Sequence, residues 1–154
     1  MDEILLSLLL EADDPNDTEY PSGFNWEGEV NRVRALRAIV EGIVGRRFEI
    51  DDNVQDASFF ADLGLYEEHK NSRGSVVRQA VLAVRFSCFG NLFTVWSTCH
   101  DSVKLSQEVI DAVIKAVSDR GYTYVPAEEL DSEYNGTNPH LRGSSWWIRF
   151  FDYL

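Results

Sequence analysis

Apolar side chains recur at helical spacing in three stretches of the chain. The longest is residues 26–44, where Asn25 is suited to cap the first turn and Gly45 is suited to end the last one. Residues 106–120 form a second such stretch, and residues 2–12 form a third and shorter one. The stripes that predict these helices are Val33, Leu36, Val40 and Ile43; Val109, Ile110, Val113, Ile114 and Val117; and Leu5, Leu8 and Leu9.

Strand-like runs rich in β-branched and aromatic residues occupy much of the remaining chain. The clearest signal is the two-residue turn Gly90-Asn91, which predicts a hairpin with Phe86 opposite Val95 and Arg85 opposite Trp96. The predicted strands are 47–50, 57–66, 76–89, 92–99, 122–125 and 146–153, with a polar loop over 67–75. Together these elements predict one α+β domain, residues 1–154, with two long helices packed on one face of an antiparallel sheet.

The run 146–153 is unusual because a strand there would be aromatic on both faces. Alternation would place Trp146, Ile148 and Phe150 on one side, and a second set that includes Arg149 on the other. Arginine among aromatic rings is typical of binding hot spots, and it also stabilises exposed sheets. A pocket or an oligomer interface is therefore predicted from Arg85, Trp96, Trp147, Arg149 and Tyr153, with partial cover by the long loops as the alternative.

Negative charge is concentrated in the first part of the chain. Residues 1–70 carry 17 acidic and 6 basic side chains, a net of −11, whereas residues 71–154 carry 9 and 8, a net of −1. This charge disfavours nucleic acid and anionic membranes as partners and favours a basic protein. The acidic loops are predicted to bind that partner, or else only to keep the chain soluble. Their residues are Asp13, Asp14, Asp17, Glu19, Glu128, Glu129, Asp131 and Glu133.

No motif in the chain indicates catalysis, a cofactor or a metal. The histidines are solitary, and a calcium-like run from Asp51 to Asp62 has Asp56 where the turn glycine belongs. The hairpin register separates Cys88 and Cys99 by roughly 20 Å, so both are expected to be free thiols. The first residues lack the basic region of a signal peptide, and no run approaches the ~20 apolar residues of a membrane span. We therefore expect a cytoplasmic protein.

The last nine residues, WWIRFFDYL, in a small acidic α+β chain resemble the immunity proteins of bacterial polymorphic-toxin systems. This resemblance implies a protein that binds and blocks a toxin domain, often a basic nuclease, without doing chemistry itself. Two other hypotheses remain open. One is a small-molecule-binding or enzymatic domain with a pocket near Arg85, Trp96 and Arg149, and the other is an oligomer subunit that uses its aromatic face as the interface.

Overall fold

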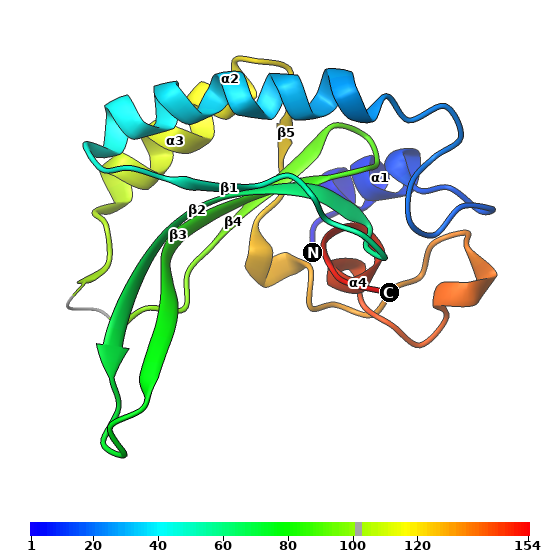
Figure 1. Cartoon of the computed structure of the whole chain (residues 1–154). Coiled ribbons are helices and arrows are strands. Elements are labelled where there is room, and N and C mark those ends of the chain that lie inside the picture. Colours follow the sequence, from blue (N-terminus) through cyan, green and yellow to red (C-terminus); the bar gives the residue numbers. More distant parts are fainter. Residues whose placement is uncertain (101–102) are drawn as a thin grey trace.

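The computed structural model describes residues 1–100 and 103–154 and has the predicted α+β architecture. Helices α2 (Trp26–Val44) and α3 (Gln107–Ser118) cover one face of a five-stranded sheet in the order β1-β2-β3-β4-β5 (Figure 1). Neighbouring strands are antiparallel except β4 and β5, which run parallel. The strands are β1 (Glu49–Asp51), β2 (Phe59–Lys70), β3 (Val76–Ser87), β4 (Leu92–Trp96) and β5 (Thr123–Tyr124). None of the described helices is long and apolar enough to cross a membrane.

The two long helices form where their caps and apolar stripes predicted. The side chain of Asn25 accepts a hydrogen bond from the backbone N–H of Gly28, and Gly45 ends α2 with φ of 73°. The side chain of Ser106 caps α3 in the same way, accepting from Val109. The stripes of both helices pack into the main core, which buries the sheet residues Phe86 and Phe93 beneath them.

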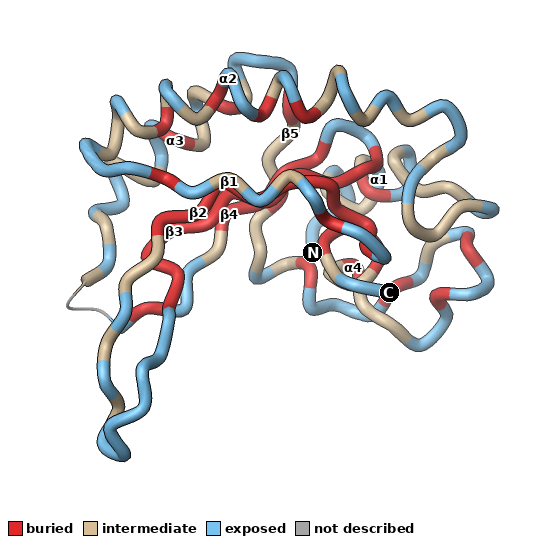
Figure 2. The backbone as a smooth tube through the Cα atoms, in the orientation of Figure 1, coloured by how far each residue is buried: buried red, intermediate tan, exposed pale blue. Residues whose placement is uncertain are grey.

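The second face of the sheet is covered along only half of its length. There α1 (Glu3–Ala12), the short helix α4 (Trp146–Phe151) and the loops that contain η2 (Ala127–Glu129) and η3 (Pro139–Leu141) pack together (Figure 1). Beyond them, β2 and β3 continue as a two-stranded arm whose end is exposed (Figure 2). Because β2 runs on to Lys70, the predicted loop over 67–75 is wrong in its first part, and only residues 71–75 form the turn.

The predicted strand over residues 146–153 is wrong, because this segment forms α4. The side chain of Ser145 accepts a hydrogen bond from the backbone N–H of Ile148 and so begins the helix. Aromatic rings one turn apart then pack together, since the Trp146 and Phe150 centroids lie 5.7 Å apart in a stacked arrangement. The alternating faces predicted for this run do not exist, and Trp146, Arg149 and Phe150 are all buried.

The predicted hairpin register is wrong by two residues. Gly90 and Asn91 do form the turn, both with positive φ, but Phe86 pairs with Phe93 rather than with Val95. The reason is that Cys88 donates its backbone N–H to Ser58 on the β2 side, so the end of β3 leaves the β3–β4 ladder. A shift of two preserves the faces of both strands. The cysteines are both buried and free, as predicted.

Candidate functional site

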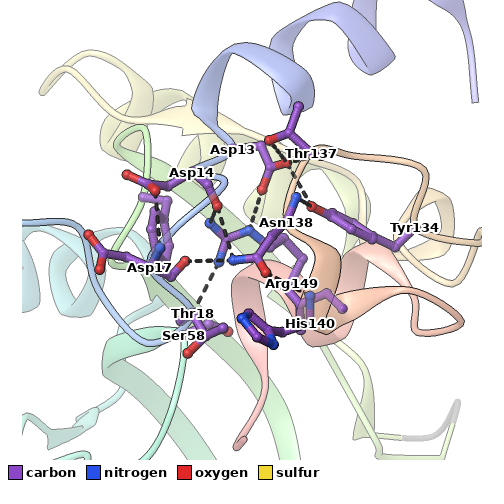
Figure 3. A network of polar contacts seen from close by, with 12 residues as sticks. Asp13, Asp14, Asp17, Thr18, Ser58, Tyr134, Thr137, Asn138, His140 and Arg149 are labelled. Carbon is purple, nitrogen blue, oxygen red and sulfur yellow. Dashed lines mark hydrogen bonds and ion pairs between the residues drawn. The ribbon is translucent and has the colours of Figure 1, made fainter.

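Arg149 lies at the centre of a buried polar network that joins the two ends of the chain (Figure 3). Its Nε donates to Asp13 Oδ1 at 2.5 Å, and both side chains of this ion pair have 0% exposure. The remaining guanidinium nitrogens donate to the backbone carbonyls of Thr18 and Asp14, at 3.1 and 3.3 Å. The guanidinium also lies 3.9 Å from the centroid of the Phe89 ring. All faces of this cation are therefore satisfied inside the chain.

The carboxylate of Asp13 is surrounded by donors as well. It accepts from the Tyr134 hydroxyl at 2.7 Å and from both the backbone N–H and the hydroxyl of Thr137. Burial by itself raises the pKa of Asp13, but the hydrogen bonds from Thr137 and Tyr134 and the ion pair with Arg149 together hold that pKa below its ordinary value. Asp13 is consequently an internal structural group, and its predicted role in partner binding is wrong.

The same network places the two acidic segments of the sequence side by side. The side-chain amide of Asn138 donates to the carbonyls of Asp14 and Asp17 (Figure 3). At the other end of α1, the backbone N of Met1 lies 2.8 Å from a carboxylate oxygen of Glu129. Residues 1–19 and 128–138, which we call the acidic surface, therefore form one continuous region. They contain no lysine or arginine.

The acidic side chains of this surface differ in their exposure and in the hydrogen bonds that they already accept. Asp14 and Asp17 accept backbone hydrogen bonds within their own loop, and hydrogen bonds to Asn16 and Asp17 lower the pKa of Asp14. Glu19 and Glu129 are partly buried, whereas Glu128, Asp131 and Glu133 are exposed. The acidic surface also includes exposed residues on α1 that were not predicted from the sequence. Their positions opposite the leucine stripe could have indicated that they face solvent. They are Asp2, Glu3, Glu11 and the apolar Ile4, which is 82% exposed.

Arg85 is held in a second, separate ion pair. Its Nε and Nη2 donate to the two carboxylate oxygens of Asp62 at 2.9 and 2.8 Å, and its Nη1 donates to the carbonyl of Phe151. Because Arg85 and Arg149 are each paired inside the chain, the predicted shared pocket is wrong. Trp96 and Trp147 do lie beside Arg85, with ring centroids 5.3 and 5.7 Å from the guanidinium carbon, while exposed Tyr153 packs on Phe59.

The open half of the sheet forms a groove at the base of the arm. Its cavity volume is about 610 Å³, and its floor and sides come from β1, β2, β3 and the region around the end of β4. The lining residues are Glu49, Ile50, Asp51, Asp62, Tyr66, Arg78, Ala80, Trp96 and Thr98. Of the residues predicted to form a pocket, only Trp96 lines it. Alternation along 57–66 could have indicated that Asp62 and Tyr66 share a face, but no sequence signal pointed to the depth of the groove.

Aromatic rings and charged groups face each other across this groove. The Tyr66 ring lies over Gly64, where an added Cβ would come within 2.2 Å of it. Arg78 stacks on that ring, 4.1 Å from its centroid, and pairs with Glu49. The indole N–H of Trp96 is buried and has no hydrogen-bond partner in the described part of the chain.

Burial is the main reason that the pKa of Asp62 is raised above its ordinary value. The ion pair with Arg85 opposes this shift, and the charge of neighbouring Asp51 adds to it. Asp51 lies directly opposite Asp62 in the β1–β2 ladder. The raised pKa therefore reflects chiefly the burial of Asp62, with a smaller contribution from the charge of Asp51.

Among residues 1–100 and 103–154, no three His, Cys, Asp or Glu side chains are grouped so that they could hold a metal ion. No protein-family model matches the chain, and neither does any curated protein or any solved structure. The functional argument therefore depends on the geometry of the acidic surface and of the groove.

Proposed function

We propose that this chain is a cytoplasmic, non-catalytic protein that binds a partner with a basic surface. The most specific version of this proposal is an immunity-type inhibitor that neutralises a basic toxin domain. The observation that carries this proposal is the continuity of the acidic surface. Two segments more than a hundred residues apart in the sequence lie side by side, with no lysine or arginine in either.

The acidic surface suits fast capture of a cation-rich protein. A field of one sign over a contiguous area raises association rates 10-fold or more and repels nucleic acid. The exposed side chains of Glu3, Glu11, Asp131 and Glu133 have no cationic partner within the described chain, so they are available to a partner. Ile4, exposed next to Glu3 at the start of α1, adds apolar area that charged groups alone do not supply.

The burial of the aromatic segment favours this proposal over an aromatic oligomer interface. Trp146, Phe150 and Phe151 are 0–1% exposed and pack into the core of a single chain. Only Tyr153, at 57%, remains largely exposed from that segment. This segment alone therefore offers little apolar area to an interface.

The test of the proposed function is genetic and then biochemical. The reading frames that flank the gene for this chain are each expressed in bacteria, alone and together with it. We expect one product to arrest growth alone and to be relieved by co-expression, with a stable complex that associates more slowly as salt rises. If no neighbouring product is toxic or binds the chain, the immunity-type proposal is wrong.

Charge variants then locate the binding surface. Neutralising Glu3, Glu11, Asp131 and Glu133 together, as Gln or Asn, should lower the association rate constant about 10-fold and change the dissociation rate less. The control neutralises four exposed acids outside the acidic surface: Glu27, Asp56, Glu108 and Asp111. Both variants change the net charge equally, so a similar effect of the two would show that only the overall charge matters.

A further inference from the structure

We propose that the groove at the base of the arm is the site that receives an arginine side chain of the basic partner. This inference rests on the proposed function and names a second point of contact. The charge balance supports it first. Glu49, Asp51 and Asp62 bring three carboxylates, whereas Arg78 and Arg85 bring two guanidinium groups, which leaves a net of −1. One further monovalent cation balances the groove.

The carboxylate that lacks a cation is Asp51. Within the described residues its only hydrogen bond is a long one, 3.4 Å, from the backbone N–H of Asn53. Glu49 and Asp62, by contrast, each pair with an arginine. Asp51 is exposed, so it is open to a group that arrives from solvent. The charge of Asp51 also contributes to the raised pKa of neighbouring Asp62, although burial is the larger cause.

Two arginines, Arg78 in the groove and Arg85 beside it, already show the geometry that we propose for the partner's guanidinium group. Arg78 stacks on Tyr66 and pairs with Glu49. Arg85 lies 3.8 Å from the Phe59 centroid and pairs with Asp62 through two parallel hydrogen bonds. Each arginine thus uses one aromatic face and one carboxylate. Asp51 lines the same groove and has no such cation among the described residues, while Trp96 stands on the opposite wall, where Arg85 lies 5.3 Å from its ring centroid.

Two small residues, Gly64 and Ala83, separate Glu49 on β1 from Trp96 on β4. In the ladders, Glu49 pairs with Gly64, Gly64 with Ala83, and Ala83 with Trp96. The walls are therefore three strand spacings apart, roughly 14 Å, and the Tyr66 ring lies over Gly64 between them.

This chemistry selects arginine over the other candidates. A planar guanidinium stacks on an indole face and forms two hydrogen bonds with one carboxylate, whereas an ammonium group does neither. An anion is disfavoured by the net negative charge of the lining. A divalent metal would need a group of three suitable ligands, and the structure places no such group among the residues it describes.

Nuclear magnetic resonance tests the site with a small probe. The full chain, labelled with ¹⁵N, is titrated with N-acetyl-arginine methylamide, and the neutral citrulline analogue is the matched control. The four tryptophans give four indole N–H signals, and Trp96→Phe identifies the signal of Trp96 by its loss. We expect the arginine probe to shift the Trp96 signal and leave those of Trp26 and Trp146, with saturation by about 50 mM for a millimolar site.

Variants connect the shift to the groove. Asp51→Asn should weaken probe binding roughly fivefold, the effect of losing one charge-assisted hydrogen bond, whereas Asp111→Asn on α3 should change it less than about twofold. Both positions are exposed, so the fold is retained. If the citrulline analogue acts equally, or if Asp51→Asn has no effect, the arginine site is overturned.

The outcomes for the groove and for the proposed function are separate. A partner complex that weakens with salt but is unchanged by Asp51→Asn would support the proposed function and overturn the groove site. Specific binding of the arginine probe without any toxic neighbour would do the opposite. Weakening of the partner complex by both Asp51→Asn and Trp96→Leu, with thermal unfolding unchanged in Asp51→Asn, supports both.

Discussion

The two buried arginines occupy opposite kinds of surroundings. Arg149 and Asp13 are fully enclosed, and hydrogen bonds from Tyr134 and Thr137 complete the carboxylate, so its pKa is lowered. Arg85 and Asp62 stand at the edge of an open groove beside a second carboxylate, and the pKa of Asp62 is raised. The first pair joins chain segments, and the second is part of a surface with unsatisfied charge. A buried ion pair is thus informative about function only through the groups around it.

Removing each arginine in turn should give the largest change in stability that distinguishes the two pairs. Arg149→Met should lower the free energy of unfolding by about 3–5 kcal/mol, because it leaves the Asp13 charge buried without its cation and the Thr18 carbonyl without the Arg149 donor. Arg85→Met should cost less, about 1–3 kcal/mol, since Asp62 lies at the groove and can take up a proton. Urea unfolding at pH 7 measures both. Equal losses would remove the distinction between the two pairs.

The two carboxylates should respond to pH in opposite directions. Asp13 has a lowered pKa, so its contribution to stability is present above the unfolded value of about 3.9 and is lost as pH falls through the lower folded pKa. Asp62 has a raised pKa, so the folded state binds the extra proton first, and stability from this group falls as pH rises through the window above about 3.9.

Asparagine variants measure these two effects. The destabilisation by Asp13→Asn, about 2 kcal/mol at pH 7, should shrink as pH falls below about 4. The destabilisation by Asp62→Asn should instead grow as pH is lowered from 7 towards 4, because only the wild type gains stability from protonation there. Unfolding curves for the three proteins at pH 7, 4 and 3 provide the comparison. Parallel pH profiles for the two variants would contradict it.

Two glycines probe how rigid each region is. An added Cβ at Gly136 would come within 2.5 Å of Asp13 Oδ2 and of the Tyr134 ring, both of which are locked in the network. Gly136→Ala should therefore lower the free energy of unfolding by about 1–3 kcal/mol. At Gly64 the clash is with the outer end of the half-buried Tyr66 ring, which can swing towards solvent. Gly64→Ala should cost less than about 1 kcal/mol, yet it should weaken binding of the arginine probe.

Local signals in the sequence predicted local structure well. Asn25 and Gly45 bounded α2 at Trp26 and Val44, and Ser106 began α3, because caps depend on residues only a few positions apart. The aromatic run that became α4 was mistaken for a strand, since β-propensity depends on context. This six-residue helix is too short to form alone, and contacts such as that of Arg85 with the Phe151 carbonyl fix it.

The site residues were less predictable because their partners are distant in the sequence. Nothing local to Asp13 indicated Arg149, 136 positions away, as its partner. The hairpin register failed for a related reason, since Cys88 bonds to Ser58 on another strand. The concentration of negative charge was easier to predict, because it is a sum over many residues. The two acidic segments, 1–19 and 128–138, do lie side by side, although the side chain of Asp13 is buried.

The smallest expected effects come from removing two donors, the Tyr134 hydroxyl, which has an acceptor, and the Trp96 N–H, which has none among the described residues. The Tyr134 hydroxyl donates to Asp13 and accepts from the backbone N–H of Asn138, so Tyr134→Phe should cost about 1–2 kcal/mol with little change in volume.

The Trp96 N–H is buried without an acceptor among the described residues. Trp96→Phe removes that unpaired donor together with some ring area, and the two effects oppose each other. We expect a change in unfolding free energy within about 0.5 kcal/mol of zero. A loss above about 1 kcal/mol would show that this N–H is already bonded in the free chain. The difference between the Arg149 network and the groove would then lie in charge alone.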